Sequence, residues 1–433
     1  MRLNWFSPLP PARTDIAHYS ARIAPALMRR FEVVFWSDLE ADPAALPEGA
    51  QLRAFDPRLA QGRDFFAQLF QGLNVYNLGN DARFHAAIAA LARRVPGLVI
   101  LHDTRLHHFV YESARHDDPP FAGYVALARA TYGERGAAAA RAIVEADGRT
   151  IERHVAAMPF VEPFLEGAFG GICHSPAAAA EVRALSDAPL LTLPLPFRSL
   201  AETSPTPRVW SPPWRFVLFG YVGSNRRLES ILRALAAWRD APDYRFDIYG
   251  SLWNPGLVDA LIRESGLHGR VNVHGFVPER ELDAAIAGAH LAFNLRQPTM
   301  GEASGGILRS WAGATPTLVT DAGWYASLPD SIVRKISPDD ELTGIRQALD
   351  ELVRTPARFA AMGEAARRHL ETAHSPEVYA ERLEAALADR SRLASALAIR
   401  RLRRRVEARV PTIREAARLS PRAEALIAGV FGG

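Results

Sequence analysis

Short apolar runs that end in glycine or a polar residue alternate with amphipathic helical segments along most of this chain. A short apolar run between turn residues indicates a buried strand, and apolar residues at helical spacing, as over residues 15–30, indicate a surface helix. Strands that alternate with helices predict parallel, doubly wound sheets of the α/β class. The predicted strands lie at residues 3–6, 31–36, 75–78, 98–101 and 171–174 in the first half, and at 215–219, 246–250, 271–275 and 289–296 in the second.

The length of 433 residues predicts two such domains, because it exceeds what one ordinary core accommodates. Prolines crowd residues 194–213, so a linker is expected there. We predict an N-terminal domain over residues 1–200, a linker over 201–213 and a C-terminal domain over 214–373.

The composition, 48% apolar and 23% charged, is ordinary for a soluble globular protein. Cys173 is the single cysteine, which excludes an internal disulfide and favours a reducing compartment. No stretch approaches the ~20 apolar residues of a spanning helix, and the N-terminus lacks the apolar core of a signal peptide. We therefore expect a cytoplasmic protein.

The stretch at residues 301–312 places one carboxylate and two adjacent glycines at the start of a helix, directly after an apolar run. A helix N-terminus favours anions, and glycine lets a ligand approach the backbone closely. Glu302 can then hold a sugar hydroxyl while the N–H groups of Gly305 and Gly306 hold a phosphate. The alternative is an ordinary helix cap with Glu302 in the first turn.

Polar residues also stand at the predicted strand ends of the first half. Asn80, His102, Asp103 and His174 each follow an apolar run. Ligands of doubly wound sheets bind at the carboxyl ends of the strands, so these positions predict a cleft. Taken singly, each residue is equally well explained as a cap or a satisfied loop residue.

Four blocks of the second half together resemble the C-terminal half of retaining family-4 glycosyltransferases of the GT-B fold, over about residues 215–330. They are the glycine loop and arginine pair at 220–227, the strand ending at Gly250, the loop at 275–278 and the stretch at 301–312. Blocks at 7–11, 76–85 and 101–108 resemble a bacterial branch of that family, whose members are commonly linked to surface polysaccharide assembly. The resemblance implies two Rossmann-like domains facing a cleft, and a helix over residues 374–390 that returns to the first domain.

The same resemblance implies transfer of a sugar from a nucleoside-diphosphate sugar to a saccharide or lipid-linked hydroxyl acceptor, with retention and with no metal or other cofactor. The donor would bind the second domain, where Arg226 holds the diphosphate, Glu302 contacts the sugar, and Phe276 with Val277 holds the base. The other donor-side positions that it implies are Gly220, Arg227, Gly250, Ser304, Gly305, Gly306 and Arg309.

On the facing side, His102 is the best candidate for a polar contact to the reacting sugar, and Asp103 is the second candidate, as an orienting group or a base. Asp15, Asn80 and His174 complete the expected acceptor side. The departing diphosphate would be stabilised electrostatically. No pair of carboxylates is established at hydrolase spacing.

Three positions depart from the family pattern. Asp15 stands where a glycine is usual, Tyr221 stands where an arginine is usual, and the second glutamate is absent, with Arg309 and Ser310 in its neighbourhood. These departures favour the main alternative, a catalytically degenerate GT-B protein that acts as a binding or scaffold subunit. The retained Arg226 and Glu302 argue against it.

A different enzyme on the same fold, such as an epimerase, stays open, because sites rather than folds carry function. A phosphorylase is disfavoured, since Lys335 is the only lysine and lies in no motif that suggests pyridoxal binding.

Residues 390–410 hold eight arginines and one glutamate, a net charge of +7, in a chain whose net charge is only +3. Leu393, Leu397 and Leu402 recur among them at helical spacing. This pattern predicts a basic amphipathic tail over residues 391–433, which can lie on an anionic membrane surface. The alternative is a solvated helix that packs on its own domain. Nucleic acid is disfavoured, because the segment lacks interleaved aromatic residues.

Overall fold

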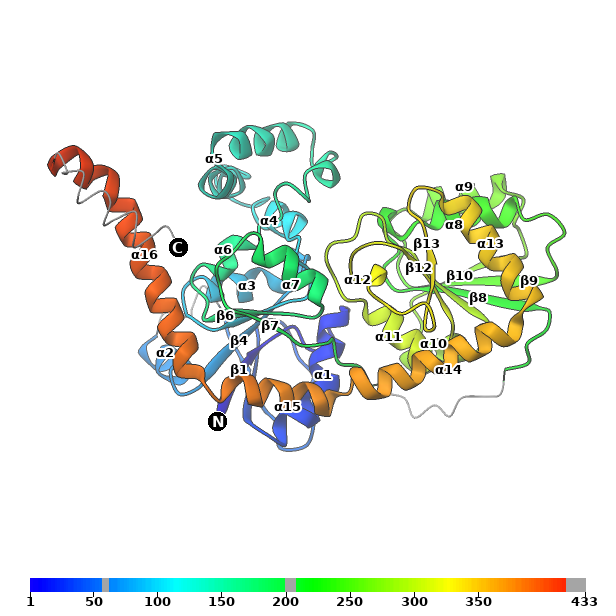
Figure 1. The fold of residues 1–433 in the computed structure, drawn as a ribbon, viewed down its shortest axis with the longest axis horizontal. Helices are drawn as coiled ribbons and strands as arrows, with labels where there is room; N and C mark the ends of the chain where they lie inside the picture. The colour runs from blue at the N-terminus through cyan, green and yellow to red at the C-terminus, as the bar shows by residue number, and fades with distance from the viewer. Residues whose placement is uncertain (57–61, 199–207, 418–433) are drawn as a thin grey trace.

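Two parallel sheets lie side by side, each covered by helices, in this computed structural model (Figure 1). The structure describes residues 1–56, 62–198 and 208–417, with residues 407–417 described by their backbone alone. The arrangement confirms the predicted doubly wound α/β class and the GT-B architecture of two Rossmann-like domains. Residues 201–207 of the predicted linker and residues 418–433 of the predicted tail lie outside the described residues.

The N-terminal sheet has the strand order β3-β2-β1-β4-β5-β6-β7, and all its neighbours pair in parallel. The order reverses beside β1, which pairs with both β2 and β4, and ligands bind at such a switch point. Its strands are β1 (Arg2–Phe6), β2 (Glu32–Ser37), β3 (Gln51–Ala54), β4 (Leu73–Leu78), β5 (Leu98–Leu101), β6 (Gly170–Cys173) and β7 (Leu190–Thr192).

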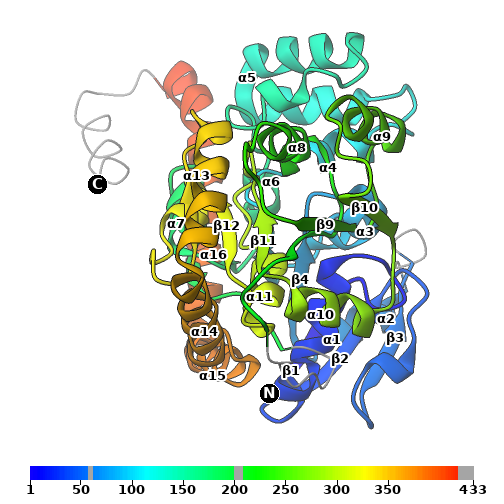
Figure 2. The ribbon, with the colours of Figure 1, turned by 90° about the vertical axis from the view of Figure 1, so that its right-hand side faces the viewer.

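The C-terminal sheet has the order β10-β9-β8-β11-β12-β13, again all parallel, and Figure 2 views the molecule from this side. Here the order reverses beside β8, which pairs with β9 and β11. Its strands are β8 (Trp214–Phe219), β9 (Tyr244–Tyr249), β10 (Val271–Gly275), β11 (Leu291–Asn294), β12 (Thr317–Thr320) and β13 (Arg334–Ile336).

Helices follow the strands as the alternation predicts. The helix expected over residues 15–30 is α1, capped by the Thr14 hydroxyl, which accepts from the Ile16 amide. The helices of the first half are α1 (Asp15–Met28), α2 (Arg63–Leu69), α3 (Ala82–Ala92), α4 (His107–Ser113), α5 (Ala122–Glu145), α6 (Glu162–Leu165) and α7 (Pro176–Arg183). Those of the second half are α8 (Leu228–Ala236), α9 (Pro255–Glu264), α10 (Glu279–Gly288), α11 (Gly305–Ala312), α12 (Gly323–Ala326), α13 (Glu341–Arg354) and α14 (Pro356–Ala373).

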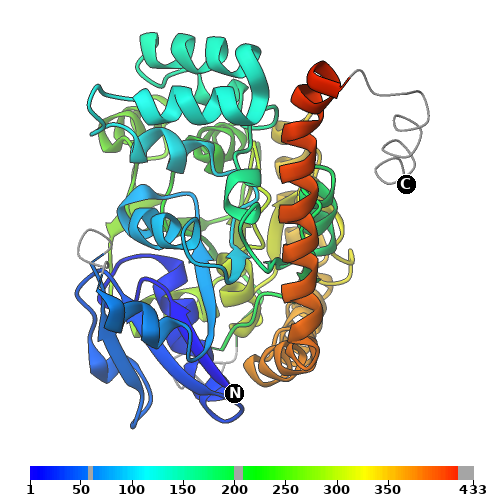
Figure 3. The same ribbon diagram turned by 90° about the vertical axis from the view of Figure 1, so that its left-hand side faces the viewer.

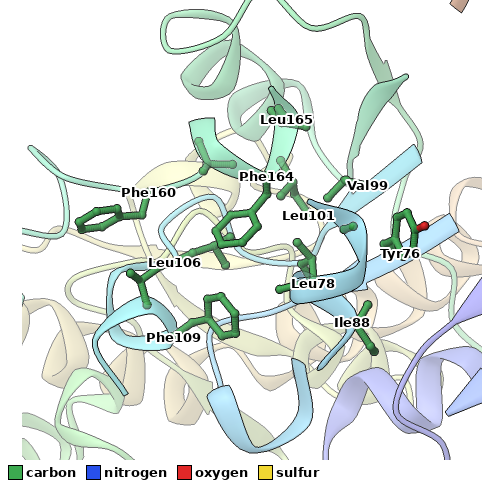
Figure 4. Packing of buried hydrophobic residues seen from close by; sticks show 14 of the residues in the cluster. Tyr76, Leu78, Ile88, Val99, Leu101, Leu106, Phe109, Phe160, Phe164 and Leu165 are labelled. Atoms are coloured by element: carbon green, nitrogen blue, oxygen red, sulfur yellow. The ribbon is translucent and has the colours of Figure 1, made fainter. Parts of the chain in front are cut away.

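The segment between β5 and β6 is largely helical, and no detailed prediction was made for it from the sequence. It holds α4, α5 and α6, and α5 projects from the N-terminal domain (Figure 1). Buried side chains of α4 and α6, such as Phe109 and Phe164, pack over Leu78 and Leu101 at the ends of β4 and β5 (Figure 4). This packing holds the strand ends that carry His102 and Asp103.

One apolar cluster crosses between the two domains. It joins Trp5 and Tyr19 of the first domain to Trp311 and Tyr325 of the second. Helix α15 (Pro376–Leu387) adds Tyr379, whose hydroxyl pairs with that of Tyr19 at 3.0 Å. Because buried apolar area stabilises roughly in proportion to its size, this cluster holds the facing strand ends near each other.

The chain then continues into α16 (Arg390–Ala417), a long helix along the N-terminal domain (Figure 3). Leu397 and Arg400 are buried against that domain, and the Arg400 guanidinium donates to the carbonyls of Leu165 and Ala168. Ile399 and Leu402 are exposed. The prediction that the tail leucines share one face is therefore wrong, since Leu397 points inward and Leu402 outward. No described helix is long and apolar enough to cross a membrane.

Candidate active site

Two arginines, buried Arg226 and half-buried Arg296, mark the strand ends of the C-terminal domain. Arg226 closes the 3-10 turn η3 (Ser224–Arg226) after β8, and only 3% of it is exposed. Its guanidinium donates to Asn294 Oδ1 at 2.8 Å and to the Phe219 carbonyl at 3.0 Å. Arg296 follows β11. Burial, and then Arg296, lowers the pKa of Arg226 to about 9, so both side chains stay charged at neutral pH.

Glu302 lies beside this pair and is held on three sides. One carboxylate oxygen, Oε2, accepts from the Met300 amide at 2.7 Å, and the other accepts from the Tyr325 hydroxyl at 3.1 Å. The guanidinium of Arg296 lies 3.5 Å from Oε1. A carboxylate oriented this firmly can accept a hydrogen bond from a ligand hydroxyl without first reorganising.

Helix α11 begins next to Glu302. Ser304 is its N-cap residue, because its hydroxyl accepts from the Ile307 amide at 3.3 Å. The cap interpretation is therefore correct for Ser304, whereas Glu302 lies before the helix rather than in its first turn. The amides of Gly305 and Gly306 belong to the first turn, where N–H groups have no intrahelical partner. They make a positive end that faces the cleft.

The N-terminal domain presents His102 and Asp103 at the end of β5. His102 Nε2 lies 3.0 Å from Asn77 Oδ1, and burial lowers the pKa of this imidazole well below 6.5, so it is neutral. Asp103 accepts from the Asn80 amide at 2.8 Å. Burial, followed by the charge of Glu302, raises the pKa of Asp103 to about 7. A carboxyl group from each domain thus faces the same space.

Backbone contacts across the cleft fix this juxtaposition. The Thr104 amide donates to the Met300 carbonyl at 3.0 Å, and the Arg105 guanidinium donates to the Thr299 carbonyl at 2.8 Å. A Cβ atom on Gly301 would overlap the Thr104 hydroxyl, and Gly301 has a φ of +75°. Only glycine suits both demands.

Comparisons with known proteins agree with this geometry. Residues 226–385 match the family described as glycosyl transferase-like. Three similar solved structures are HepE from Anabaena in complex with UDP-glucose, sucrose-phosphate synthase from Thermosynechococcus elongatus, and WaaG, a glycosyltransferase involved in lipopolysaccharide biosynthesis. A search of curated proteins finds no match.

The chain is 13% identical to HepE, 15% to the synthase and 16% to WaaG, with TM-scores of 0.58, 0.59 and 0.54. The alignments cover 90%, 90% and 88% of this chain and 99%, 98% and 99% of the other chains. They confirm the GT-B fold along most of its length. The chain therefore has the GT-B fold, and its residues 226–385 are similar to the glycosyl transferase-like family.

Two predicted donor-side arginines already have carboxylate partners. Arg227 forms an ion pair with Glu341 at 2.7 Å, and Arg309 pairs with Asp283 at 2.5 Å and with Glu279 at 2.9 Å. Ion pairing reduces what each guanidinium can offer a phosphate. Arg226 and Arg296 therefore supply the positive charge nearest Glu302.

The predicted glycines and the predicted base loop lie at the same edge of the sheet. Gly250 donates to the Gly275 carbonyl at 2.6 Å, and a Cβ atom on it would overlap the Gly220 carbonyl, so these glycines let the loops after β8, β9 and β10 meet. Phe276 is 58% exposed, while Val277 packs against a small apolar cluster. Phe276 thus presents an exposed aromatic ring beside the cleft.

The predicted acceptor-side residues divide in two groups. Asn80 and His174 form hydrogen bonds within the N-terminal domain. The Asn80 side chain accepts from the Phe109 amide at 2.9 Å. His174 is buried behind His102, and its Nδ1 lies 3.1 Å from the Leu193 carbonyl. Asp15 is exposed at the start of α1 and faces Gly305 of the other domain.

Sequence reasoning missed Arg296, Tyr325 and Asn294. Arg296 is the first charged residue after β11, so the rule that ligands bind at strand ends could have identified it. Asn294 donates to Ser304 Oγ at 3.2 Å and accepts from Arg226, which links the turn after β8 to the cap of α11. Tyr325 lies on the short helix α12, where no pattern in the sequence signals a role.

Among the described residues, no group of three or more histidine, cysteine, aspartate and glutamate side chains is placed to hold a metal ion.

Proposed function

We propose that this glycosyltransferase moves a sugar from a nucleoside-diphosphate sugar to a hydroxyl acceptor with retention of the anomeric configuration. The observation that carries the proposal is the pair of guanidinium groups, buried Arg226 and half-buried Arg296, beside the oriented carboxylate of Glu302. Buried cations that outnumber their immediate carboxylate partners favour an anionic ligand.

The donor side acts through charge. When the bond between the sugar and the diphosphate breaks, its electron pair stays on the diphosphate oxygen. Arg226, Arg296 and the first-turn amides of α11 stabilise that developing charge in a site that excludes much of the water. Glu302, held by Tyr325 and the Met300 amide, accepts a hydrogen bond from a sugar hydroxyl.

The acceptor side acts through groups that carry little charge. Neutral His102 offers a hydrogen bond to the reacting sugar, and Asp103 orients the attacking hydroxyl. A carboxyl group with a pKa near 7 can also exchange a proton at the working pH. Retention requires that the acceptor attack from the face that the diphosphate leaves.

UDP-sugars are the first donors to test, because the similar HepE structure holds UDP-glucose. We place the reaction in bacterial surface polysaccharide or glycolipid assembly. The bacterial-type motifs of the first domain support this pathway, as does the similarity to WaaG, which is involved in lipopolysaccharide biosynthesis.

The test is calorimetric titration of the protein with UDP, GDP, ADP and their glucose or mannose derivatives. We expect one nucleotide series to bind, and Glu302→Gln to lose the preference for the nucleotide sugar over the free nucleotide. The matched control is Glu229→Gln, on the exposed face of α8, where no change is expected. The anomeric configuration of the product, measured by NMR, tests retention. No binding at millimolar concentration would instead favour the scaffold function.

We also propose a peripheral position on an anionic membrane, with α16 as the contact. Its inward residues Leu397 and Arg400 fix the helix on the N-terminal domain, which leaves Ile399, Leu402 and neighbouring arginines exposed. Such a face attracts anionic lipid at about 1 kcal/mol per basic residue. Co-sedimentation with vesicles that contain or lack phosphatidylglycerol tests this proposal. We expect the protein to sediment only with the anionic vesicles, and less of it at high salt or in the double variant Ile399→Ser with Leu402→Ser. Equal recovery with both kinds of vesicle would contradict the proposal.

A further inference from the structure

The loop before α1 reaches the donor side of the cleft at two points. The guanidinium of Arg13 lies over the exposed ring of Phe276, 4.9 Å from its centre. The Asp15 carboxylate lies 4.0 Å from the point where a Cβ atom on Gly305 would stand. One short segment of the N-terminal domain therefore faces both the aromatic surface after β10 and the first turn of α11.

The charge of Asp15 acts on the two buried cations. Its carboxylate raises the pKa of Arg226 and of Arg296, in each case as a smaller effect than burial. Arg226 Nε is buried and has no hydrogen-bond partner among the described residues. The Asp15 carboxylate is therefore attracted by the same guanidinium groups that would attract an anion bound to the α11 amides, and it repels that anion.

We propose that Asp15 discriminates between the nucleotide-sugar donor and the nucleoside-diphosphate product by charge. This inference rests on the proposed function. In the donor the terminal phosphate is esterified to the sugar. In the product the same phosphate keeps the electron pair of the broken bond, and it carries about one further negative charge at pH 7, since the second ionisation of a phosphate has a pKa near 6.

A carboxylate that faces the terminal phosphate repels the product more than the donor. At about 7 Å and an effective dielectric constant near 20 to 40, one additional charge pair changes affinity by roughly one order of magnitude. Asp15 therefore weakens product binding selectively and promotes release of the nucleotide after transfer. The same charge slightly opposes bond cleavage. Asp15 therefore lowers the rate of sugar transfer slightly and raises the rate of nucleotide release.

The test compares the dissociation constants of UDP and UDP-glucose, with GDP and GDP-mannose as a second pair, for the wild type and for Asp15→Asn at pH 7.5. This variant removes the charge and keeps the size of the side chain. We expect the nucleotide sugar to bind about ten-fold tighter in Asp15→Asn and the nucleoside diphosphate about a hundred-fold tighter, so that the ratio of the two dissociation constants changes about ten-fold. Asp81→Asn, which changes a carboxylate that caps α3 in the same domain, is the matched control and should leave both constants unchanged.

A second measurement separates charge from shape. At pH 5 the terminal phosphate of the free nucleotide is largely protonated, so the effect of Asp15→Asn on the nucleotide should fall to its effect on the nucleotide sugar. Nucleotide binding that responds equally to the substitution at both pH values, or not at all, overturns the inference and leaves the proposed function intact. If neither the wild type nor Asp15→Asn binds any nucleotide, the proposed function and this inference fail together.

Discussion

The two edges that face each other across the cleft are built on the same kind of sheet but carry opposite electrostatics. On the C-terminal side, Arg226 and Arg296 are fixed positive charges at the ends of β8 and β11. On the N-terminal side, His102 is neutral and Asp103, whose pKa burial raises to about 7, is only partly ionised at neutral pH. Both edges mix buried and half-buried side chains, so the difference arises from which side chains stand at the strand ends.

Under the proposed function, this difference assigns the two halves of the reaction to the two domains. A fixed positive edge is preorganised for a diphosphate, whose charge grows as the sugar leaves. A nearly neutral edge is suited to a sugar and an acceptor hydroxyl, which carry no charge. The cleft therefore separates the charged and uncharged parts of the substrate pair, and the predictions below alter one edge at a time.

The largest effect is expected from removing a charge on the positive edge. Arg226→Gln should lower kcat/KM about 10³-fold, because the leaving diphosphate loses a buried guanidinium. It should also destabilise the protein by about 3 kcal/mol, since Asn294 Oδ1 and the Phe219 carbonyl lose their donors. Steady-state kinetics and urea unfolding measure the two effects.

Arg226→Lys keeps a positive charge and should recover part of both losses, although one ammonium cannot serve both acceptors equally well. Arg233→Gln, in an exposed ion pair on α8, is the matched control and should change neither quantity measurably. Similar kinetics for Arg226→Gln and the wild type would mean that the positive edge does not hold the leaving group.

The sequence predicted the positive edge only in part. Arg226 was identifiable because a glycine loop and a helix surround it, whereas Arg296 was hidden at the end of an apolar run. Arg227 and Arg309 were predicted as donor contacts from position alone. Their partners, Glu341 and Asp283, lie 114 and 26 residues away, and no local pattern reveals such distant pairing.

On the N-terminal edge, the sequence predicted the positions of the residues but not their protonation states. The strand-end rule placed His102 and Asp103 correctly at the end of β5, because strand and loop are local features. Their protonation states could not be predicted, since these depend on burial by α4 and α6 and on Glu302 from the other domain. The positions of these residues at a strand end could thus be predicted from the sequence. Their pKa values could be assigned only once the structure showed how the two domains meet.

An effect of intermediate size is expected from the titration of Asp103. Its pKa is 3.8 without perturbation and about 7 in the folded protein, so the native state binds the proton more tightly than the unfolded state. The stability it contributes is complete below pH 4 and is lost as the pH rises through 7. Between pH 4 and pH 8 the wild type should lose about 4 kcal/mol relative to Asp103→Asn, which has no such proton.

Urea unfolding of both proteins at several pH values measures this difference. Asp330→Asn, whose carboxylate is 83% exposed, is the control and should follow the wild type at every pH. Parallel pH profiles for the wild type and Asp103→Asn would show that Asp103 is an ordinary carboxylate and that the edge is not neutral.

The smallest effect is expected where a group orients another without touching the substrate. Tyr325→Phe removes the hydroxyl that donates to Glu302 at 3.1 Å, while the Met300 amide and Arg296 continue to hold that carboxylate. One neutral donor to a charged acceptor contributes about 1 to 1.5 kcal/mol, so kcat should fall about five- to ten-fold. Because Glu302 keeps its charge, the dissociation constant of the free nucleotide should stay within two-fold of the wild type, roughly 0.4 kcal/mol. Equal losses in nucleotide binding and in kcat would place Tyr325 on the positive edge itself, in direct contact with the diphosphate, rather than behind Glu302.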